Sequence, residues 1–379
     1  MNLPTTEQSV IDSHYMARAL ELARKGLYTT HPNPRVGCII VHDGHIIGEG
    51  WHERTGEPHA EMHALRTTGD KACGSTVYVT LEPCSYHGHT PPCVHALVTA
   101  GVARVVAGTL DPNPKVAGRG LQRLAKAGID IHSGVLEKEA RALNPGFFKR
   151  MKYGLPFVRV KLAMSLDGRT AMANGKSQWI TGPATRSAVQ RLRAEASVVL
   201  TGADTVLVDG ARLVVCATEL GLDEATTALA MSRLPIRVLI DGRLRVPLNA
   251  PFFKAGPALV VTCVPSENQF LRGDHEYLVV PCLNGYVDLH SALVALAARD
   301  VNEVLVEAGA SLAGAFAQQD LVDEYVIFIA GKFLGSTARP LLDWPLEKLA
   351  DAPRLKITRV RAIGDDWRIT AMPVRIVSI

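Results

Sequence analysis

The stretch of sequence that decides the fold of the first half runs from Pro58 to Cys93. It opens with Pro58-His59-Ala60-Glu61 and closes with Leu81-Glu82-Pro83-Cys84 and Pro91-Pro92-Cys93. One imidazole and two thiols are the ligand types of a catalytic zinc site, which keeps its fourth position open. The carboxylate of Glu61 is a group that a structural zinc site would not need. We therefore predict zinc ligands at His59, Cys84 and Cys93, with Glu61 as the acid and base beside the metal.

The flanking sequence predicts how these side chains converge. Pro58 suits the first turn of a helix, which would place His59 in that turn. Thr76 to Leu81 alternates apolar and polar residues, as a strand does, and delivers Cys84 at its end. Pro92 starts another helix with Cys93 in its first turn. The positive ends of helices favour thiolates, so both predicted helix starts suit a metal site.

Helices and strands alternate around this stretch. Apolar spacing predicts a helix over 12–26, and Asp43-Gly44 predicts a hairpin between strands 38–41 and 45–47. Further strands are expected over 102–108 and 129–132, around a helix over 118–127. This order favours a three-layer α/β/α domain with its site at the ends of the strands.

The second half predicts a separate α/β domain. Proline and glycine residues gather between Leu143 and Pro156, and we place the boundary there, giving domains 1–150 and 151–379. A helix is expected over 183–196 and a closing antiparallel hairpin over 355–374. Apolar runs predict strands over 157–164, 198–200, 236–240, 259–262, 304–307 and 325–330.

Composition limits the possible classes of protein. The 379 residues carry a net charge of +4 without a basic run, which argues against nucleic acid as a partner. No apolar run has transmembrane length, so no membrane-spanning segment is expected. Met1 to Tyr15 lacks the apolar core of a signal peptide, so secretion is not expected either. The predicted location is the cytoplasm. Seven cysteines do not suggest a disulfide framework. Those outside the predicted zinc site are expected to be small buried residues: Cys38, Cys73, Cys216, Cys263 and Cys282.

Other interpretations of the cluster stay open. His59 and His63 are four residues apart on a predicted helix, so both could bind one metal. The glutamate stands at the third position and not the second, so the His-Glu-x-x-His protease motif is not met. A structural zinc site, or two buried cysteines without metal, would also fit these residue types. A non-catalytic scaffold stabilised by zinc is the corresponding alternative for function.

The residues quoted above resemble the zinc-dependent cytidine-deaminase-like superfamily, whose pattern is His-x-Glu followed by Pro-Cys-x-x-Cys. Here eight residues, Ser85 to Pro92, separate the cysteines where most relatives have two. That long insert is similar to the riboflavin-biosynthesis branch of the superfamily, as are the runs His31 to Gly37 and Asp111 to Pro114. The resemblance implies that Asn33 contacts the pyrimidine.

Runs in the second half resemble the reductase half of a bifunctional riboflavin-pathway enzyme: Val160 to Arg169, Ser177 to Thr181 and Val306 to Gly309. The resemblance implies a zinc-dependent deaminase followed by a dihydrofolate-reductase-like α/β domain. The first would deaminate a phosphoribosylaminopyrimidine, and the second would use NADPH to open its ribose to a ribityl chain. The sequence has no Gly-x-Gly-x-x-Gly motif, so NADPH rests on the resemblance. A homo-oligomer is expected, and a nucleic-acid base deaminase with an appended binding domain is the alternative.

The resemblance also implies roles for individual residues of the second half. Cofactor-binding positions would be Ala163, Trp179, Thr205, Asp209 and Gly309. Reductase substrate positions would be Lys161, Ser177, Arg193, Leu213 and Glu307.

One loop departs from the reductase pattern. Relatives have approximately Ala-Asp-Asp-Pro-x-Leu-Thr-Val-Arg where this chain has Val208 to Cys216. The arginine implied to bind the substrate phosphate is replaced by Cys216, which offers neither charge nor reach. We therefore expect weak binding of the phosphorylated substrate, with Arg193 left as the main phosphate contact.

Overall fold

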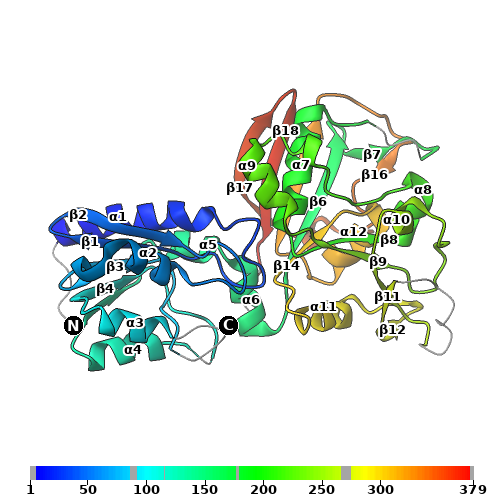
Figure 1. The fold of residues 1–379 in the computed structure, drawn as a ribbon. Helices are drawn as coiled ribbons and strands as arrows, with labels where there is room; N and C mark the ends of the chain where they lie inside the picture. Colours follow the sequence, from blue (N-terminus) through cyan, green and yellow to red (C-terminus); the bar gives the residue numbers. More distant parts are fainter. Residues whose placement is uncertain (1–5, 86–91, 115, 176–178, 266–274, 376–379) are drawn as a thin grey trace. The chain divides into compact units, whose positions relative to one another are not determined.

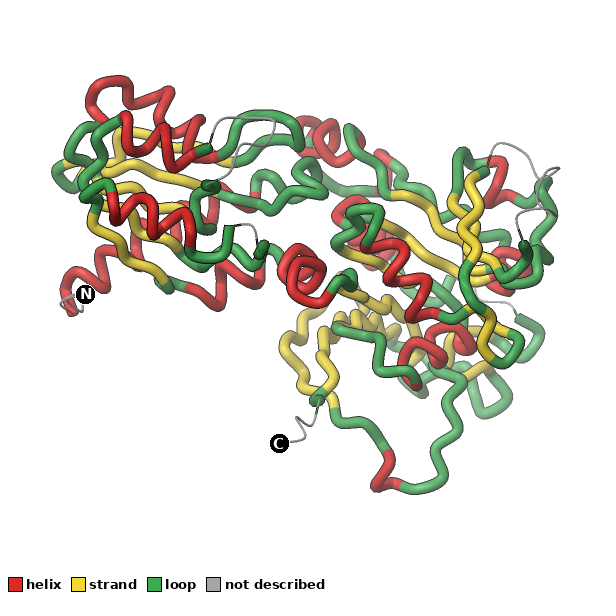
Figure 2. The backbone as a smooth tube through the Cα atoms, turned by 90° about the horizontal axis from the view of Figure 1, so that it is seen from below, coloured by secondary structure: helices red, strands yellow, loops and turns green. Residues whose placement is uncertain are grey.

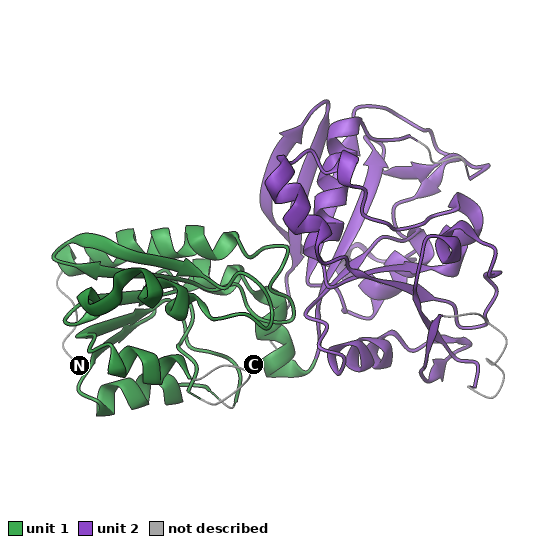
Figure 3. Cartoon of the chain, in the orientation of Figure 1, with its two compact units in different colours: residues 1–154 green, residues 155–379 purple. Residues whose placement is uncertain are grey.

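The computed structural model of the protein describes residues 6–85, 92–114, 116–175, 179–265 and 275–375. The chain forms two compact units, residues 1–154 and 155–379 (Figure 3). The boundary expected from the sequence lies four residues earlier. The expected linker contains a helix, α6 (Pro145–Tyr153), which ends at Gly154 with a positive φ of 66°.

Unit 1 is built on a five-stranded sheet with the order β2-β1-β3-β4-β5 (Figure 1). The hairpin strands pair antiparallel around Asp43-Gly44, as predicted, and β1 also pairs antiparallel with β3. The strands β3, β4 and β5 run parallel. Their bounds are β1 (Gly37–His42), β2 (His45–Trp51), β3 (Thr76–Val79), β4 (Arg104–Ala107) and β5 (Asp130–Ser133).

Helices cover both faces of this sheet, which confirms the predicted three layers. Alternation along β1 sends Ile39 to a core shared with α1 and α5, and Ile40 to a core shared with α2, α3 and α4. Among the described residues the first helix begins at Thr6, before the predicted start. The helices are α1 (Thr6–Arg24), α2 (Ala60–Thr68), α3 (Cys93–Thr99), α4 (Arg119–Lys126) and α5 (Glu137–Ala142).

Unit 2 is built on a nine-stranded sheet with the order β11-β10-β9-β8-β14-β6-β15-β18-β17. The strands from β11 to β15 are parallel, and the predicted closing hairpin adds β18 and β17 antiparallel at one edge. The bounds are β6 (Phe157–Ser165), β8 (Val198–Gly202), β9 (Ile236–Ile240), β10 (Leu259–Thr262), β11 (Glu276–Val279), β14 (Glu303–Val306), β15 (Glu324–Ala330), β17 (Leu355–Ile363) and β18 (Asp366–Pro373).

Helices pack on both faces of the second sheet as well, as the red and yellow segments of Figure 2 show. One core lies under α11 and α12, and the other under α7, α8 and α10. The helices are α7 (Pro183–Glu195), α8 (Ala203–Asp209), α9 (Glu224–Met231), α10 (Pro251–Lys254), α11 (Leu289–Ala297) and α12 (Ala310–Gln318). Two short ribbons complete the unit: β7 (Arg169–Ala171) with β16 (Arg339–Pro340), and β12 (Cys282–Leu283) with β13 (Tyr286–Val287).

In the part of the chain that the structure describes, no helix combines the length and apolar character needed to cross a membrane. The prediction for the remaining cysteines is right for Cys38, which is buried, and wrong for the others. Cys73 and Cys282 are exposed, and Cys216 and Cys263 are partly exposed. These four residues lie in loops or in a short ribbon, outside the helices and the strands of the two large sheets.

Candidate active site

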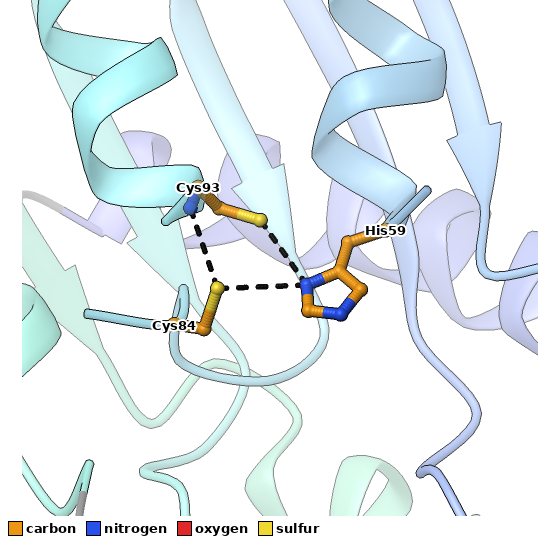
Figure 4. Close-up of side chains that lie close together, drawn as sticks. All are labelled: His59, Cys84 and Cys93. Atoms are coloured by element: carbon orange, nitrogen blue, oxygen red, sulfur yellow. Dashed lines mark hydrogen bonds between the residues drawn. The ribbon is translucent and has the colours of Figure 1, made fainter. Parts of the chain in front are cut away.

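Three side chains of unit 1 meet at one point (Figure 4). His59 Nδ1 lies 3.3 Å from Cys93 Sγ and 3.5 Å from Cys84 Sγ, and the backbone N–H of Cys93 donates to Cys84 Sγ at 3.3 Å. The three potential ligand atoms all lie within 4.8 Å of one another. The structure therefore brings together the three residues that the sequence predicts as ligands.

Each of these residues is placed by the end of a regular element. Cys93 is the first residue of α3, and Cys84 follows the end of β3. His59 is the N-cap residue of α2, with extended φ and ψ of −74° and 166°, so it precedes the first turn in which we expected it. Gly50 lets this end of α2 approach β2, because a Cβ at Gly50 would lie 2.4 Å from the carbonyl oxygen of Ala60.

The pKa values of the cluster reflect its close packing. A hydrogen bond from the Cys93 thiol, with further help from His59, lowers the pKa of Cys84 to about 4 despite burial. The resulting thiolate raises the pKa of His59 to about 9, against the effect of burial. The pKa of Cys93 is raised by its neighbour Cys84 and by burial. The Cys84 thiolate thus interacts with two protonated neighbours, the Cys93 thiol and the His59 ring. A bound cation can replace those protons.

Glu61 lies in the first turn of α2 with only 3% of its surface exposed. Burial raises the pKa of its carboxyl group, and His59 opposes that effect. The Cys93 thiol is one of its hydrogen-bond partners. The structure therefore places a buried carboxylic acid beside the cluster of His59, Cys84 and Cys93.

The donor set fits zinc. Two ligands of a tetrahedral zinc ion, one nitrogen and one sulfur at ordinary bond lengths, lie about 3.6 Å apart. The separations of 3.3 and 3.5 Å between His59 Nδ1 and the two sulfur atoms agree with that value. His63 is not part of the group: its Nδ1 faces Glu53 Oε1 at 3.9 Å. Among the described residues these three form the group, and three is the number of protein ligands that catalytic zinc sites use.

Asn33 is connected to the cluster of His59, Cys84 and Cys93 by a second histidine, His52. Its amide nitrogen lies 3.1 Å from His52 Nε2, and His52 Nδ1 lies 3.2 Å from the carbonyl oxygen of Pro58. A carbonyl oxygen accepts, so Nδ1 carries the proton, and burial lowers the pKa of His52, which keeps the ring neutral. Its Nε2 therefore accepts from the Asn33 amide, which turns Oδ1 of Asn33 away from His52. The His52 and His59 rings meet edge to face at 5.5 Å.

Glu82 organises the loop that borders the cluster. One carboxylate oxygen accepts from the N–H groups of Asp111 at 3.1 Å and Gly118 at 2.8 Å, and the other from those of Gly120 at 2.8 Å and Leu121 at 3.3 Å. The residue is 3% exposed. Glu82 lies two residues before Cys84, so its buried carboxylate connects the segment that carries Cys84 to the start of α4.

The same loop carries a second buried acid. Burial raises the pKa of Asp111 to about 7, although its carboxylate accepts from the N–H of Asn113 at 2.8 Å. Asp111 was predicted only as part of a resemblance, and no role was predicted for His52 or Glu82. The His52 contacts join distant segments, and the Glu82 contacts go to backbone groups, so the sequence carries no side-chain signal for them.

In unit 2, three predicted substrate residues meet. Glu307 accepts from Arg193 Nε at 2.5 Å and Nη2 at 3.0 Å, and Lys161 Nζ lies 3.8 Å from its Oε2. The sheet explains this meeting: β14 and β6 are parallel neighbours with Val306 opposite Val160, so Glu307 and Lys161 follow side by side. Arg193 projects from the last turn of α7 onto the same face.

Burial affects these charges. The pKa of Lys161 is lowered by burial more than Glu307 raises it. Burial favours the neutral form of Glu307, but Arg193 and Lys161 outweigh it and lower its pKa. The group is therefore a nearly enclosed set of two cations and one carboxylate.

Two predicted cofactor residues also meet: the N–H of Gly309 donates to Thr205 Oγ1 at 3.1 Å. Gly309 is the N-cap residue of α12 and provides no side-chain cap. The other predicted cofactor residues lie on β6, on α8 one turn after Thr205, and at an exposed position. Ala163 is on β6, Asp209 is the last residue of α8, and Trp179 is 66% exposed with the Arg186 guanidinium 4.6 Å from its ring.

The remaining predicted substrate residues differ in their surroundings. Leu213 is 5% exposed and packs in the core, with a φ of 52°, so its side chain has little surface for a substrate. Ser177 lies outside the described residues. Cys216 is held through its backbone, because its N–H donates to Gln190 Oε1 at 3.0 Å. Arg193 Nη1 holds the same loop through the carbonyl oxygen of Val214 at 2.9 Å.

Comparisons with known proteins match both units. Residues 9–109 match the cytidine and deoxycytidylate deaminase zinc-binding region, and residues 156–369 match the RibD C-terminal domain. The riboflavin biosynthesis protein RibD of Escherichia coli K12 is 52% identical over 94% of this chain and 97% of its own length. That of Haemophilus influenzae is 45% identical over 97% and 99%.

Solved structures agree over the whole chain. Acinetobacter baumannii RibD is 42% identical with a TM-score of 0.87, covering 97% of this chain and 100% of its own. A diaminohydroxyphosphoribosylaminopyrimidine deaminase/5-amino-6-(5-phosphoribosylamino)uracil reductase from Thermotoga maritima is 33% identical with a TM-score of 0.85 and the same coverage. The chain belongs to the RibD family of riboflavin biosynthesis, in which a zinc-dependent deaminase and an NADPH-dependent reductase are joined in one polypeptide.

Proposed function

We propose that unit 1 deaminates a diaminohydroxyphosphoribosylaminopyrimidine and that unit 2 reduces the resulting 5-amino-6-(5-phosphoribosylamino)uracil, as the name of the Thermotoga maritima relative indicates for that protein. The observation that carries the first step is the cluster of His59, Cys84 and Cys93 with the buried Glu61 beside it. The observation that supports the second is the enclosed group of Lys161, Arg193 and Glu307.

In unit 1, His59, Cys84 and Cys93 would hold the zinc ion. Bound zinc lowers the pKa of a water molecule from about 15.7 toward about 7 and so makes a nucleophile available at neutral pH. Glu61 takes the two protons of the attacking water in turn and passes one to the ring nitrogen and one to the departing amine, so that water and the amino group become a carbonyl and ammonia. The Asn33 amide oxygen orients the pyrimidine, because His52 fixes the amide nitrogen on the other side.

In unit 2, the residues that would hold NADPH are Ala163, Trp179, Thr205, Asp209 and Gly309. Gly309 lacks a side-chain cap, so the first N–H groups of α12 suit an anionic group such as a cofactor phosphate. Bound NADPH supplies the hydride. Lys161, Ser177, Arg193 and Glu307 would bind the ribosyl substrate, and the Lys161 ammonium would donate a proton to an oxygen.

Substitution of Glu61 tests the deaminase proposal. Glu61→Gln keeps the ligands but removes the proton carrier, so zinc content should stay stoichiometric while ammonia release falls by about 10²–10⁴-fold. Reduction of the uracil substrate by the same variant should be unchanged. The control is Glu57→Gln, an exposed residue whose carboxylate lies 3.9 Å from Arg54. Ammonia release within tenfold of the wild-type rate would contradict the role of Glu61.

We also propose that the protein is a homo-oligomer. The edge strand β17 is exposed along most of its length, and apolar side chains lie on this hairpin: Ile357 is 59% exposed, Val360 52% and Trp367 53%. A second copy that pairs along this edge would cover them. Light scattering tests this, since the chain mass is 40.8 kDa and a solution mass equal to it would contradict the proposal. The cytoplasmic location stays a prediction from the sequence.

A further inference from the structure

Two cysteines of unit 2, outside both proposed sites, are brought together by the sheet. Cys263 directly follows β10, and Cys282 opens β12. Between them β11 runs parallel to β10, with Val279 opposite Thr262, and the N–H of Val280 donates to the carbonyl oxygen of Thr262 at 3.0 Å. The chain therefore returns to the same end of the sheet just before Cys282.

The two side chains are close enough that the Cys282 thiol helps to raise the pKa of Cys263. Cys263 Sγ also lies 3.8 Å from the carbonyl oxygen of Pro281, the residue before Cys282. The Cys263 backbone is fixed, because its N–H donates to the carbonyl oxygen of Gly242 at 3.2 Å. The segments that carry the two cysteines are therefore held beside each other at one end of the sheet.

The two cysteines differ in how exposed they are, and this difference predicts which thiol an oxidant meets first. Cys282 is exposed, whereas Cys263 is partly covered, and burial raises the pKa of Cys263 to about 11, with a smaller effect from Cys282. Reactivity toward oxidants follows thiolate character and exposure. Cys282 is thus the thiol that an oxidant reaches first, and Cys263 is the neighbour that closes the bond.

We propose that Cys263 and Cys282 form a reversible disulfide when the protein meets a hydroperoxide. The Cys282 thiolate attacks the peroxide oxygen, the O–O bond breaks, and a sulfenic acid and one alcohol or water molecule result. The Cys263 sulfur then attacks the sulfenic sulfur, the S–S bond forms, the S–O bond breaks, and water leaves. Two thiols and one hydroperoxide are consumed, and a dithiol reductant restores both thiols by exchange.

The other cysteines differ in their surroundings. Cys84 and Cys93 are the proposed zinc ligands, and Cys38 is buried. The sulfur of Cys216 lies 3.2 Å from Thr218 Oγ1. The disulfide would tie β10 to β12 at the end of the parallel strands where Glu307 and Gly309 also lie. The proposed modification therefore lies at the end of the sheet that carries the predicted reductase-site residues.

The test uses the full-length, zinc-loaded protein treated with dilute hydrogen peroxide. Intact mass should fall by two hydrogen atoms, free thiols in denaturant should fall from seven to five, and dithiothreitol should reverse both. Peptide mapping without reductant should find one bridge, between Cys263 and Cys282, with no zinc released. A bridge that involves any other cysteine, or an unchanged thiol count, overturns the proposal.

Single variants separate the two roles. Cys263→Ser should leave a sulfenic acid at Cys282 that dimedone traps, whereas Cys282→Ser should show neither trapping nor mass loss. The matched control is Cys73→Ser, which removes an exposed cysteine of unit 1 and should keep the full loss of two hydrogen atoms. Mass loss that survives in Cys282→Ser, or disappears in Cys73→Ser, contradicts the assignment.

Discussion

Arg193 and Glu307 form a two-point ion pair, with both guanidinium contacts at 3.0 Å or less. Their side chains are 17% and 8% exposed. A third donor of Arg193 goes to Val214, so three of its N–H groups are used inside the protein. Arg193 therefore orients Glu307 and the loop after α8, and a substrate phosphate would have to use the donors that remain.

Glu307→Gln should destabilise unit 2 strongly. It leaves the Arg193 guanidinium and the Lys161 ammonium nearly buried without a carboxylate, and breaking one partner of a buried pair costs about 3–5 kcal/mol. Urea unfolding followed by circular dichroism measures the change. The control, Glu276→Gln, breaks the exposed pair with Arg299 and should cost at most about 1 kcal/mol. Equal losses in the two variants would contradict the importance of burial here.

Cys216→Arg should strengthen substrate binding by the reductase. The backbone at Cys216 is already held by Gln190, so a guanidinium at this position could reach a phosphate without rebuilding the loop. A charged hydrogen bond contributes about 1.5–3 kcal/mol, so KM should fall about 10- to 150-fold with NADPH saturating. Cys216→Ser is the matched control and should leave KM unchanged. No change in the arginine variant would mean that another group, such as Arg212, already holds the phosphate.

Glu82→Gln should disturb the deaminase and spare the reductase. The amide keeps one acceptor oxygen but turns an N–H₂ group toward two backbone N–H groups, which leaves buried donors unpaired at about 1–3 kcal/mol. We expect earlier urea unfolding of unit 1 and a higher KM for deamination, with stoichiometric zinc retained. Glu137→Gln, which loses an exposed pair with Arg141, is the control. A normal KM together with normal stability would show that the loop does not depend on Glu82.

Asp12→Asn should remove a pH-dependent part of the stability of unit 1. Burial raises the pKa of Asp12, but hydrogen bonds from Arg104, Gln8 and Tyr78 outweigh it and lower the pKa below 3.8. The ionised carboxylate thus stabilises the fold above the unfolded pKa, and this contribution is lost as pH falls through the folded pKa. Urea unfolding should show a loss of about 3–5 kcal/mol in the variant at neutral pH. The difference should shrink as pH falls below about 4; a constant difference would contradict this account.

The regular elements could be predicted because burial leaves a periodic pattern. The strands over 236–240 and 259–262 coincide with the structure, since parallel strands covered on both faces are mostly apolar runs. The closing hairpin was predicted from its turn at Gly364, where φ is 56°. The meeting of His59, Cys84 and Cys93 could be predicted because metal chemistry restricts the residue types.

Contacts between a side chain and distant backbone could not be predicted in the same way. Glu82 stands in the quoted motif, yet its four partners are N–H groups that any residue would provide. Leu213 was assigned to a substrate by its position, but the loop adopts a positive φ there and turns the side chain into the core. Such outcomes depend on the loop conformation, which local propensity does not determine.

The strand order of unit 2 also determines when the unit can form during synthesis. β6 (Phe157–Ser165) is its first strand, but both of its neighbours, β14 (Glu303–Val306) and β15 (Glu324–Ala330), come much later in the chain. At roughly 5–20 residues per second on the ribosome, many seconds separate them. Unit 1, whose five strands all precede β6, can fold in that interval, while β6 waits with both edges unpaired. The nascent reductase therefore exposes unpaired strand edges for longer than unit 1 does.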